Sequence, residues 1–123
     1  MPGLSEPPGV AHLAIGAGRS VVATAGQVPL DADGMLVGPD DHRAQAEQVL
    51  RNLLLTLETA GGTPDEVLKT TVYVAGGDHD AQVAVWSVVR GSAVGRAPST
   101  LLGVERLGYR GQLVEVEALA IIE

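Results

Sequence analysis

The alternation of hydrophobic and polar residues predicts short strands interrupted by two helices. Apolar residues recur at three- and four-residue spacing over Ala46–Ala60, which is typical of one face of a long α-helix. Pro39–Asp41 offers an N-cap for this helix, and Gly61–Gly62 predicts its end. A second helix is expected over Ala81–Arg90, between an aspartate-containing loop and a glycine. Polar residues of the first helix are expected mostly on the side away from the apolar stripe: Gln45, Glu47, Arg51 and Glu58.

Strands account for the other apolar stretches, which are His12–Ala17, Val21–Ala25, Val67–Ala75, Thr100–Leu107 and Gln112–Ile122. Gln27–Leu30 and Met35–Val37 flank the turn sequence Asp31–Gly34 and are expected to form a hairpin. Thr63–Glu66 is a capping box that predicts one short helical turn. Residues 1–123 are expected to form a single α+β domain, with one mixed β-sheet and two helices packed on one face.

The last predicted strand has two faces of different character. One face is fully apolar and suits packing against the helices: Val114, Val116, Ala118, Ala120 and Ile122. The opposite face carries Leu113, Glu115, Glu117, Leu119 and Ile121, which is too apolar to lie in water. No third helix is predicted to cover it. Burial against further copies of the chain is the simplest solution, so we expect a homo-oligomer.

Composition and charge narrow the classes of partner. The chain has 8 lysines and arginines against 15 aspartates and glutamates, and its aromatic residues are Trp86, Tyr73 and Tyr109. Nucleic acid is therefore not an expected partner, because binding it needs cations and stacking rings. The sequence contains neither a secretory signal nor a membrane-spanning stretch, so a cytoplasmic location without membrane contact is expected. Cysteine is absent and the three histidines are scattered, so no metal site is expected.

Several segments together resemble one known family. They are Ala25–Asp31, Gln48–Leu53, Leu68–Val74 and Leu113–Ala118, which keep the family's order and spacing over roughly His12–Ile122. The chain is similar to the reactive-intermediate deaminases, the RidA or YjgF family, historically called endoribonuclease L-PSP. The resemblance implies a chorismate-mutase-like fold and a homotrimer with small-molecule clefts between neighbouring subunits. It also implies hydrolysis of enamines or imines to ketones and ammonia, with no metal or organic cofactor.

Glu115 is the candidate catalytic residue. Glu115 and Glu117 lie two residues apart on one strand face, about 6.7 Å between Cα atoms, so each disfavours ionisation of the other. A carboxylate whose pKa is raised toward neutrality suits proton transfer from water. By its place in the motif, Glu115 resembles the family's water-activating glutamate, whereas Glu117 is interpreted as structural. The alternative is that both are solvated or salt-bridged strand glutamates.

Two departures from the family pattern affect the substrate site. The family holds the substrate carboxylate with an arginine in a Pro-Ala-Arg-Ser/Thr segment, and here Ser99 is taken to occupy the arginine's place. A hydroxyl supplies neither the charge nor the bidentate geometry of a guanidinium. Arg96 is a candidate replacement, although a loop arginine is usually solvated. Val10 stands where the family often has a tyrosine, so the cleft is expected to favour a neutral or differently shaped ligand.

Three further residues are assigned to the cleft. Gly26 matches a glycine whose backbone approaches the ligand, with a strand bulge as the alternative. Thr100 offers a backbone N–H group near the ligand. His12 is interpreted either as a titrating group in the cleft or as a partly buried strand histidine.

The sequence thus predicts a homotrimeric RidA-like hydrolase of a small imine, enamine or related C–N compound. Glu115 would activate water, and Ser99 with backbone groups near Gly26 and Thr100 would orient the ligand. A non-catalytic trimer that binds a small metabolite or a partner protein is the alternative, and the departures at Ser99 and Val10 favour it. A ribonuclease follows only from the historical family label, and the negative charge opposes it.

Overall fold

The computed structural model of the chain describes residues 3–4, 13–15 and 20–123. Its elements in chain order are β1 (Leu13–Ile15), β2 (Ser20–Thr24), α1 (His42–Thr59), the 3₁₀ turn η1 (Pro64–Glu66), β3 (Val67–Ala75), α2 (His79–Arg90), β4 (Ser99–Val104) and β5 (Val114–Ile122). The five strands form one sheet in the order β1-β2-β5-β3-β4. All neighbouring strands are antiparallel except β3 and β4, which are parallel.

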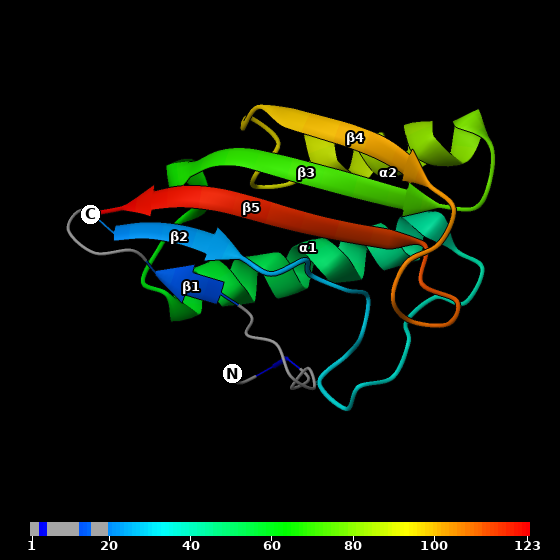
Figure 1. Cartoon of the computed structure of the whole chain (residues 1–123), viewed down its shortest axis with the longest axis horizontal. Coiled ribbons are helices and arrows are strands. Elements are labelled where there is room, and N and C mark those ends of the chain that lie inside the picture. The colour runs from blue at the N-terminus through cyan, green and yellow to red at the C-terminus, as the bar shows by residue number, and fades with distance from the viewer. Residues whose placement is uncertain (1–2, 5–12, 16–19) are drawn as a thin grey trace.

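Both helices lie on one side of this mixed sheet, behind it in Figure 1, so the predicted α+β architecture is confirmed. We call this side the helix face. The residues that point to the other side define the open face: Val21 and Ala23 of β2, Lys69, Thr71 and Tyr73 of β3, Thr100 and Leu102 of β4, and Glu115, Glu117, Leu119 and Ile121 of β5. Within the described ranges no helix covers the open face. Neither α1 nor α2 is long and apolar enough to cross a bilayer.

Helix α1 begins and ends where its sequence predicts. The side chain of Asp41 accepts a hydrogen bond from the Ala44 backbone N–H at 3.0 Å, which satisfies one of the free donors of the first turn. At the other end Gly61 adopts a φ of +83°, and the Gly62 N–H donates to the Leu57 carbonyl at 2.8 Å. These are the bonds of a Schellman motif, whose left-handed residue favours glycine. The apolar stripe packs into the core through Ala46, Val49, Leu50, Leu53 and Leu57.

The polar side of α1 differs from the sequence-based expectation. The pattern predicts Gln45 on the solvent side, but the residue is fully buried. Its Nε2 donates to the carbonyls of Gly38 and Gly111 at 3.2 and 3.0 Å, and its Oε1 accepts from the Leu113 N–H at 2.7 Å. Buried backbone groups need hydrogen-bond partners, and the Gln45 amide provides them for two irregular segments. Gln45 therefore ties the loop before α1 to the turn before β5.

The predicted hairpin at residues 27–37 is only partly formed. The turn is present, since the Asp31 carboxylate accepts from the N–H groups of Asp33 and Met35 at 2.9 and 3.0 Å. The arms, however, shrink to one bridge between Leu30 and Leu36. Gln27 pairs instead with Val116 of β5, through backbone bonds of 2.7 and 3.2 Å. The start of the first arm therefore pairs with the central sheet rather than with the second arm.

The remaining strands follow their predicted alternation. On β5 the residues of the apolar face are buried, whereas Glu115, Glu117 and Ile121 are half-buried and Leu119 is exposed. Helix α2 begins two residues before its predicted start, at His79, because the side chain of Asp78 caps the Ala81 N–H at 3.1 Å. Strand β4 ends at Val104, three residues before its predicted end.

Candidate functional site

Glu115 lies near the start of β5 on the open face, where its carboxylate is held by a buried neighbour. Gln112 Nε2 donates to Glu115 Oε1 at 3.0 Å and to the Val114 carbonyl at 3.1 Å. The other end of the Gln112 amide accepts the Tyr109 N–H at 3.1 Å, so its orientation is determined by the backbone. Gln112 is only 3% exposed. The Glu115 carboxylate is therefore a positioned group rather than a freely rotating surface acid.

Gly26 lies directly against this carboxylate. A Cβ atom built on Gly26 would collide with Oε2, Cδ and Cγ of Glu115. The adjacent Gln27 holds this segment in place through its backbone pairing with Val116 and through its side-chain Oε1, which accepts from the buried Thr56 hydroxyl at 3.0 Å. The structure thus brings together Gly26 and Glu115, two residues that the sequence assigns to one cleft.

Glu117 lies two residues further along the same face and has a different partner. The Tyr73 hydroxyl donates to Glu117 Oε1 at 2.6 Å. This hydrogen bond raises the pKa of the Tyr73 phenol above its ordinary value, with smaller contributions from burial and from the negative charges of Glu117 and Glu115. The raised pKa keeps the phenol protonated over a wider pH range, so Tyr73 remains a donor to Glu117.

A cation and a hydroxyl lie further along the open face, on the side of Glu117 away from Glu115. Lys69 Nζ donates to Thr100 Oγ1 at 2.6 Å, and Lys69 is the only lysine or arginine within the five strands. A shallow hollow of about 210 Å³ opens on this part of the open face, and Lys69, Thr71, Glu117 and Leu119 are among its lining residues. Along the open face the phenol thus lies at Glu115 and Glu117, and the ammonium group follows on the far side of Glu117.

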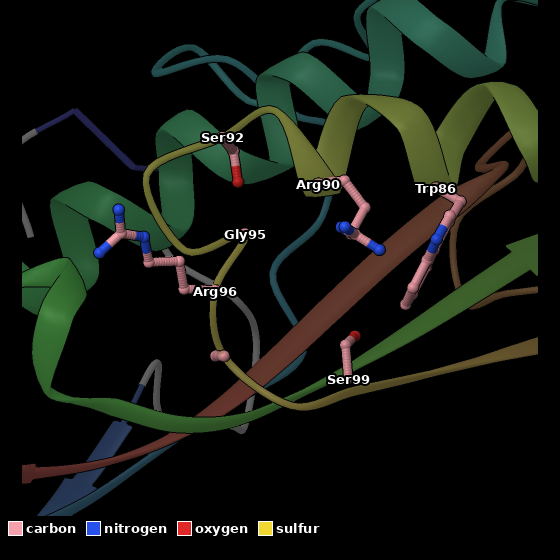
Figure 2. A pocket seen from close by; sticks show the side chains of 7 residues that line it. Trp86, Arg90, Ser92, Gly95, Arg96 and Ser99 are labelled. Atoms are coloured by element: carbon pink, nitrogen blue, oxygen red, sulfur yellow. The ribbon is translucent and has the colours of Figure 1, made fainter.

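Ser99 and Arg96 lie elsewhere. Consecutive residues of a strand point to opposite faces, so Ser99 points to the helix face while Thr100 points to the open face. Ser99 accepts a hydrogen bond from the buried Thr70 hydroxyl at 2.7 Å and lines a pocket of about 570 Å³ together with Arg96, Trp86 and Arg90 (Figure 2). Within one chain, the structure therefore separates Ser99 and Arg96 from Glu115 by the thickness of the sheet.

Val10 and His12, the other two predicted cleft residues, lie outside the described residues. The sequence reasoning did not assign Lys69 and Tyr73, which are polar groups of the open face, or the buried Gln112, which holds Glu115. For Lys69 and Tyr73 the signal was available, because the two-residue period of β3 puts them opposite the apolar Val72 and Val74. No comparable signal exists for Gln112, whose side chain folds back from a turn. In the part of the chain that the structure describes, no three acidic or histidine side chains are grouped as metal ligands.

The family model of endoribonuclease L-PSP matches residues 10–122, nearly the whole chain. The chain belongs to the RidA/YjgF family. A RutC family protein of Synechocystis is 35% identical over 108 residues, which cover 86% of this chain and 82% of that protein. A crystal structure of a Rid family protein of unknown function from Yersinia pestis superposes with a TM-score of 0.73 at 35% identity, covering 85% of this chain and 80% of that one.

A third relative of this RidA/YjgF protein carries a functional name. It is the 2-iminobutanoate/2-iminopropanoate deaminase of Salmonella typhimurium, which is 42% identical over 55 residues, covering 45% of this chain and 42% of that enzyme. The family match and the superposition establish the family and the fold of this RidA/YjgF protein.

Proposed function

We propose that this protein hydrolyses a small imine or enamine to a carbonyl compound and ammonia, with Glu115 as the residue that activates water. The observation that carries the proposal is the held carboxylate of Glu115 on the open face, between Gln112 and the bare backbone of Gly26. Membership of the RidA/YjgF family and the name of the Salmonella relative support the reaction class.

The chemistry needs one group that accepts and returns a proton. As the oxygen of a water molecule bonds to the imine carbon, the Glu115 carboxylate accepts a proton from that water and passes it to the imine nitrogen, which gives a carbinolamine. Glu115 then accepts the proton of the carbinolamine hydroxyl and delivers it to the nitrogen as the C–N bond breaks, so a carbonyl group and ammonia leave and Glu115 is again a carboxylate. An enamine enters this sequence as the imine, after a proton has moved from its nitrogen to its β-carbon. Gln112 contributes by holding one carboxylate oxygen, so the reacting group needs little reorganisation.

We assign substrate binding on this face to Lys69 and Thr100. If the family's Pro-Ala-Arg segment is aligned on Pro98, its arginine corresponds to Thr100 rather than to Ser99. Thr100 shares the face of Glu115, and the Lys69 ammonium lies 2.6 Å from its hydroxyl. Lys69 is a point charge without the fork of a guanidinium, so it attracts a carboxylate but orients it less strictly.

A second copy of the chain would complete the cleft. Val21, Leu102 and Leu119 of the open face are 39%, 46% and 40% exposed, which is costly for large apolar side chains in water. Closing the open faces of three chains against one another would bury these residues and exclude water from the glutamates. The homotrimer and the cytoplasmic location are part of this proposal.

Ammonia release tests the activity. Imines generated in situ by an amino acid oxidase would be hydrolysed by wild type, and Glu115→Gln would lower the rate about 10²- to 10⁴-fold because the amide accepts no proton. Glu105→Gln is the matched control, since Glu105 is exposed and pairs only with the neighbouring Arg106. Equal rates for Glu115→Gln and wild type would remove Glu115 from the reaction.

One observation favours a non-catalytic binding protein of the same fold. The strands carry no arginine, so the open face lacks the bidentate carboxylate clamp that the family resemblance implies. A binding protein would show a higher melting temperature with its metabolite but no ammonia release.

A further inference from the structure

The pocket on the helix face has the composition of an anion site. It lies between the C-terminal half of α2, the loop that follows it and the first residue of β4. In Figure 2 the Arg90 guanidinium and the Ser99 hydroxyl both point into the space beside Trp86, whereas the Arg96 guanidinium points away from them. Arg90, Ser99 and Trp86 therefore converge, and Arg96 contributes positive charge from the rim.

Neither Arg90 nor Arg96 forms an ion pair within the described part of the chain, where Arg106 pairs with Glu105. Arg96 also borders a neighbouring hollow together with Asp65. The protein as a whole carries a formal charge of −7. The guanidinium of Arg90, aimed into a concave site, creates a local positive potential that favours an anion even in an acidic chain. The forked donors of Arg90 match the oxygens of a carboxylate or a phosphate.

Ser99 adds a directed donor to the same site. The Thr70 hydroxyl, which is fully buried, donates to Ser99 Oγ at 2.7 Å. Because Ser99 Oγ accepts this bond, its own hydrogen remains available to donate into the pocket. The bond to the buried Thr70 holds the Ser99 oxygen beside the pocket, so less side-chain freedom is lost when a ligand binds.

The pocket is larger than an inorganic ion needs. Its volume of about 570 Å³ lies in the range of small-molecule sites. The ring of Trp86 forms one wall, and Trp86 also borders an apolar hollow of about 270 Å³ that is lined by Val83 and Leu101. A ligand held at Arg90 can therefore place an apolar or planar group against the indole.

We propose that this pocket binds a small organic anion, whose carboxylate or phosphate group is held by Arg90 and Ser99 and whose apolar part lies against Trp86. The site is separate from Glu115, because Ser99 and the open-face residues lie on opposite sides of the sheet. It does not depend on the proposed hydrolysis.

The indole beside the site provides the signal for the test. Trp86 is the only tryptophan in the chain, so its fluorescence reports on this pocket directly. Phenylpropanoate and phenyl phosphate are the two anionic probes and distinguish the two kinds of acid group. Phenylpropanamide is the uncharged control. At least one anionic probe should give a saturable change that the amide does not produce at the same concentrations.

Variants locate the binding site. Arg90→Gln should raise the Kd of the anionic probe about tenfold or more, and Ser99→Ala should raise this Kd by a smaller factor. Arg110→Gln is the matched control, since Arg110 is an exposed arginine outside the pocket. Glu115→Gln and Lys69→Gln should bind the probe as wild type does, whether or not the protein hydrolyses imines. Equal affinity for amide and acid, an unchanged Kd in Arg90→Gln, or loss of binding in Lys69→Gln or Glu115→Gln would overturn the proposal.

Discussion

The carboxylate of Glu115 lies where a side chain at residue 26 would begin, so only glycine at residue 26 is compatible with this position of the glutamate. The φ angle of Gly26 is not in the left-handed region, and its backbone alone would admit other residues. The requirement for glycine is therefore set by the neighbouring acid on β5. It makes the position of Glu115 testable without changing Glu115 itself.

Gly26→Ala should displace the Glu115 carboxylate and lower ammonia release about 10²-fold, because a shift of about 1 Å in a reacting group costs this much. Gly108→Ala is the matched control, since a Cβ there meets no atom within 4 Å and the residue has no positive φ. Melting curves would establish that both variants fold. Full activity in a folded Gly26→Ala variant would contradict the catalytic position of Glu115.

Arginine substitutions at two adjacent residues would show which face binds the substrate carboxylate. Thr100→Arg places a guanidinium on the face of Glu115 and should raise kcat/KM for a 2-imino acid about tenfold or more. Ser99→Arg places it on the helix face and should leave kcat/KM near the wild-type value. A gain confined to Ser99→Arg would mean that the substrate is bound on the helix face.

Leu102→Asp should dissociate the proposed homotrimer. Leu102 is 46% exposed on the open face and its cross-strand neighbour is Tyr73 rather than a cation, so burial against another copy would leave the new charge unpaired. Light scattering coupled to size exclusion would measure the change from a trimeric to a monomeric mass. Met35→Asp serves as the control, because Met35 is an exposed apolar residue in a loop away from the sheet. A monomeric wild type would contradict the assembly before any variant is made.

The pKa of Tyr73 should lie above that of an ordinary phenol. Deprotonation removes the hydrogen bond to Glu117 and adds a negative charge near two glutamates. The folded state holds this proton more tightly than the unfolded state does. The stabilisation is therefore complete below the unfolded pKa of about 10 and is lost as the pH rises through the higher folded value. Absorbance of the phenolate measures the titration.

The matched variant for this titration is Glu117→Gln. It keeps an acceptor oxygen but removes the negative charge, so the pKa of Tyr73 should fall toward that of an ordinary phenol. Tyr73→Phe leaves Tyr109 as the only phenol and separates the two contributions. Superimposable titration curves for wild type and Glu117→Gln would show that Glu117 does not control the Tyr73 proton.

Repeating patterns made much of the fold predictable. The stripe of α1, its Asp41 cap and its glycine end depend only on residues within one helix. The alternation along β3 and β5 likewise separates a buried face from an open one, and the pair Glu115 and Glu117 is assigned to the open face by that period alone. These features depend on residues that are close together in the chain, so they can be predicted from the sequence alone.

The site depended on contacts between distant segments. The pattern of α1 predicts Gln45 at the surface, but its side-chain amide is buried and bonds to the backbone of two loops. Gln27 is predicted in a hairpin arm, but it pairs with Val116 of β5. The sequence assigns Ser99 to the cleft of Glu115, but the register of β4 on β3 puts Thr100 on that face and Ser99 on the helix face. By itself, the sequence determined the elements and the two-faced character of the central strands. Only the tertiary structure decided which residues meet there, because backbone groups in irregular segments find their hydrogen-bond partners far away along the chain.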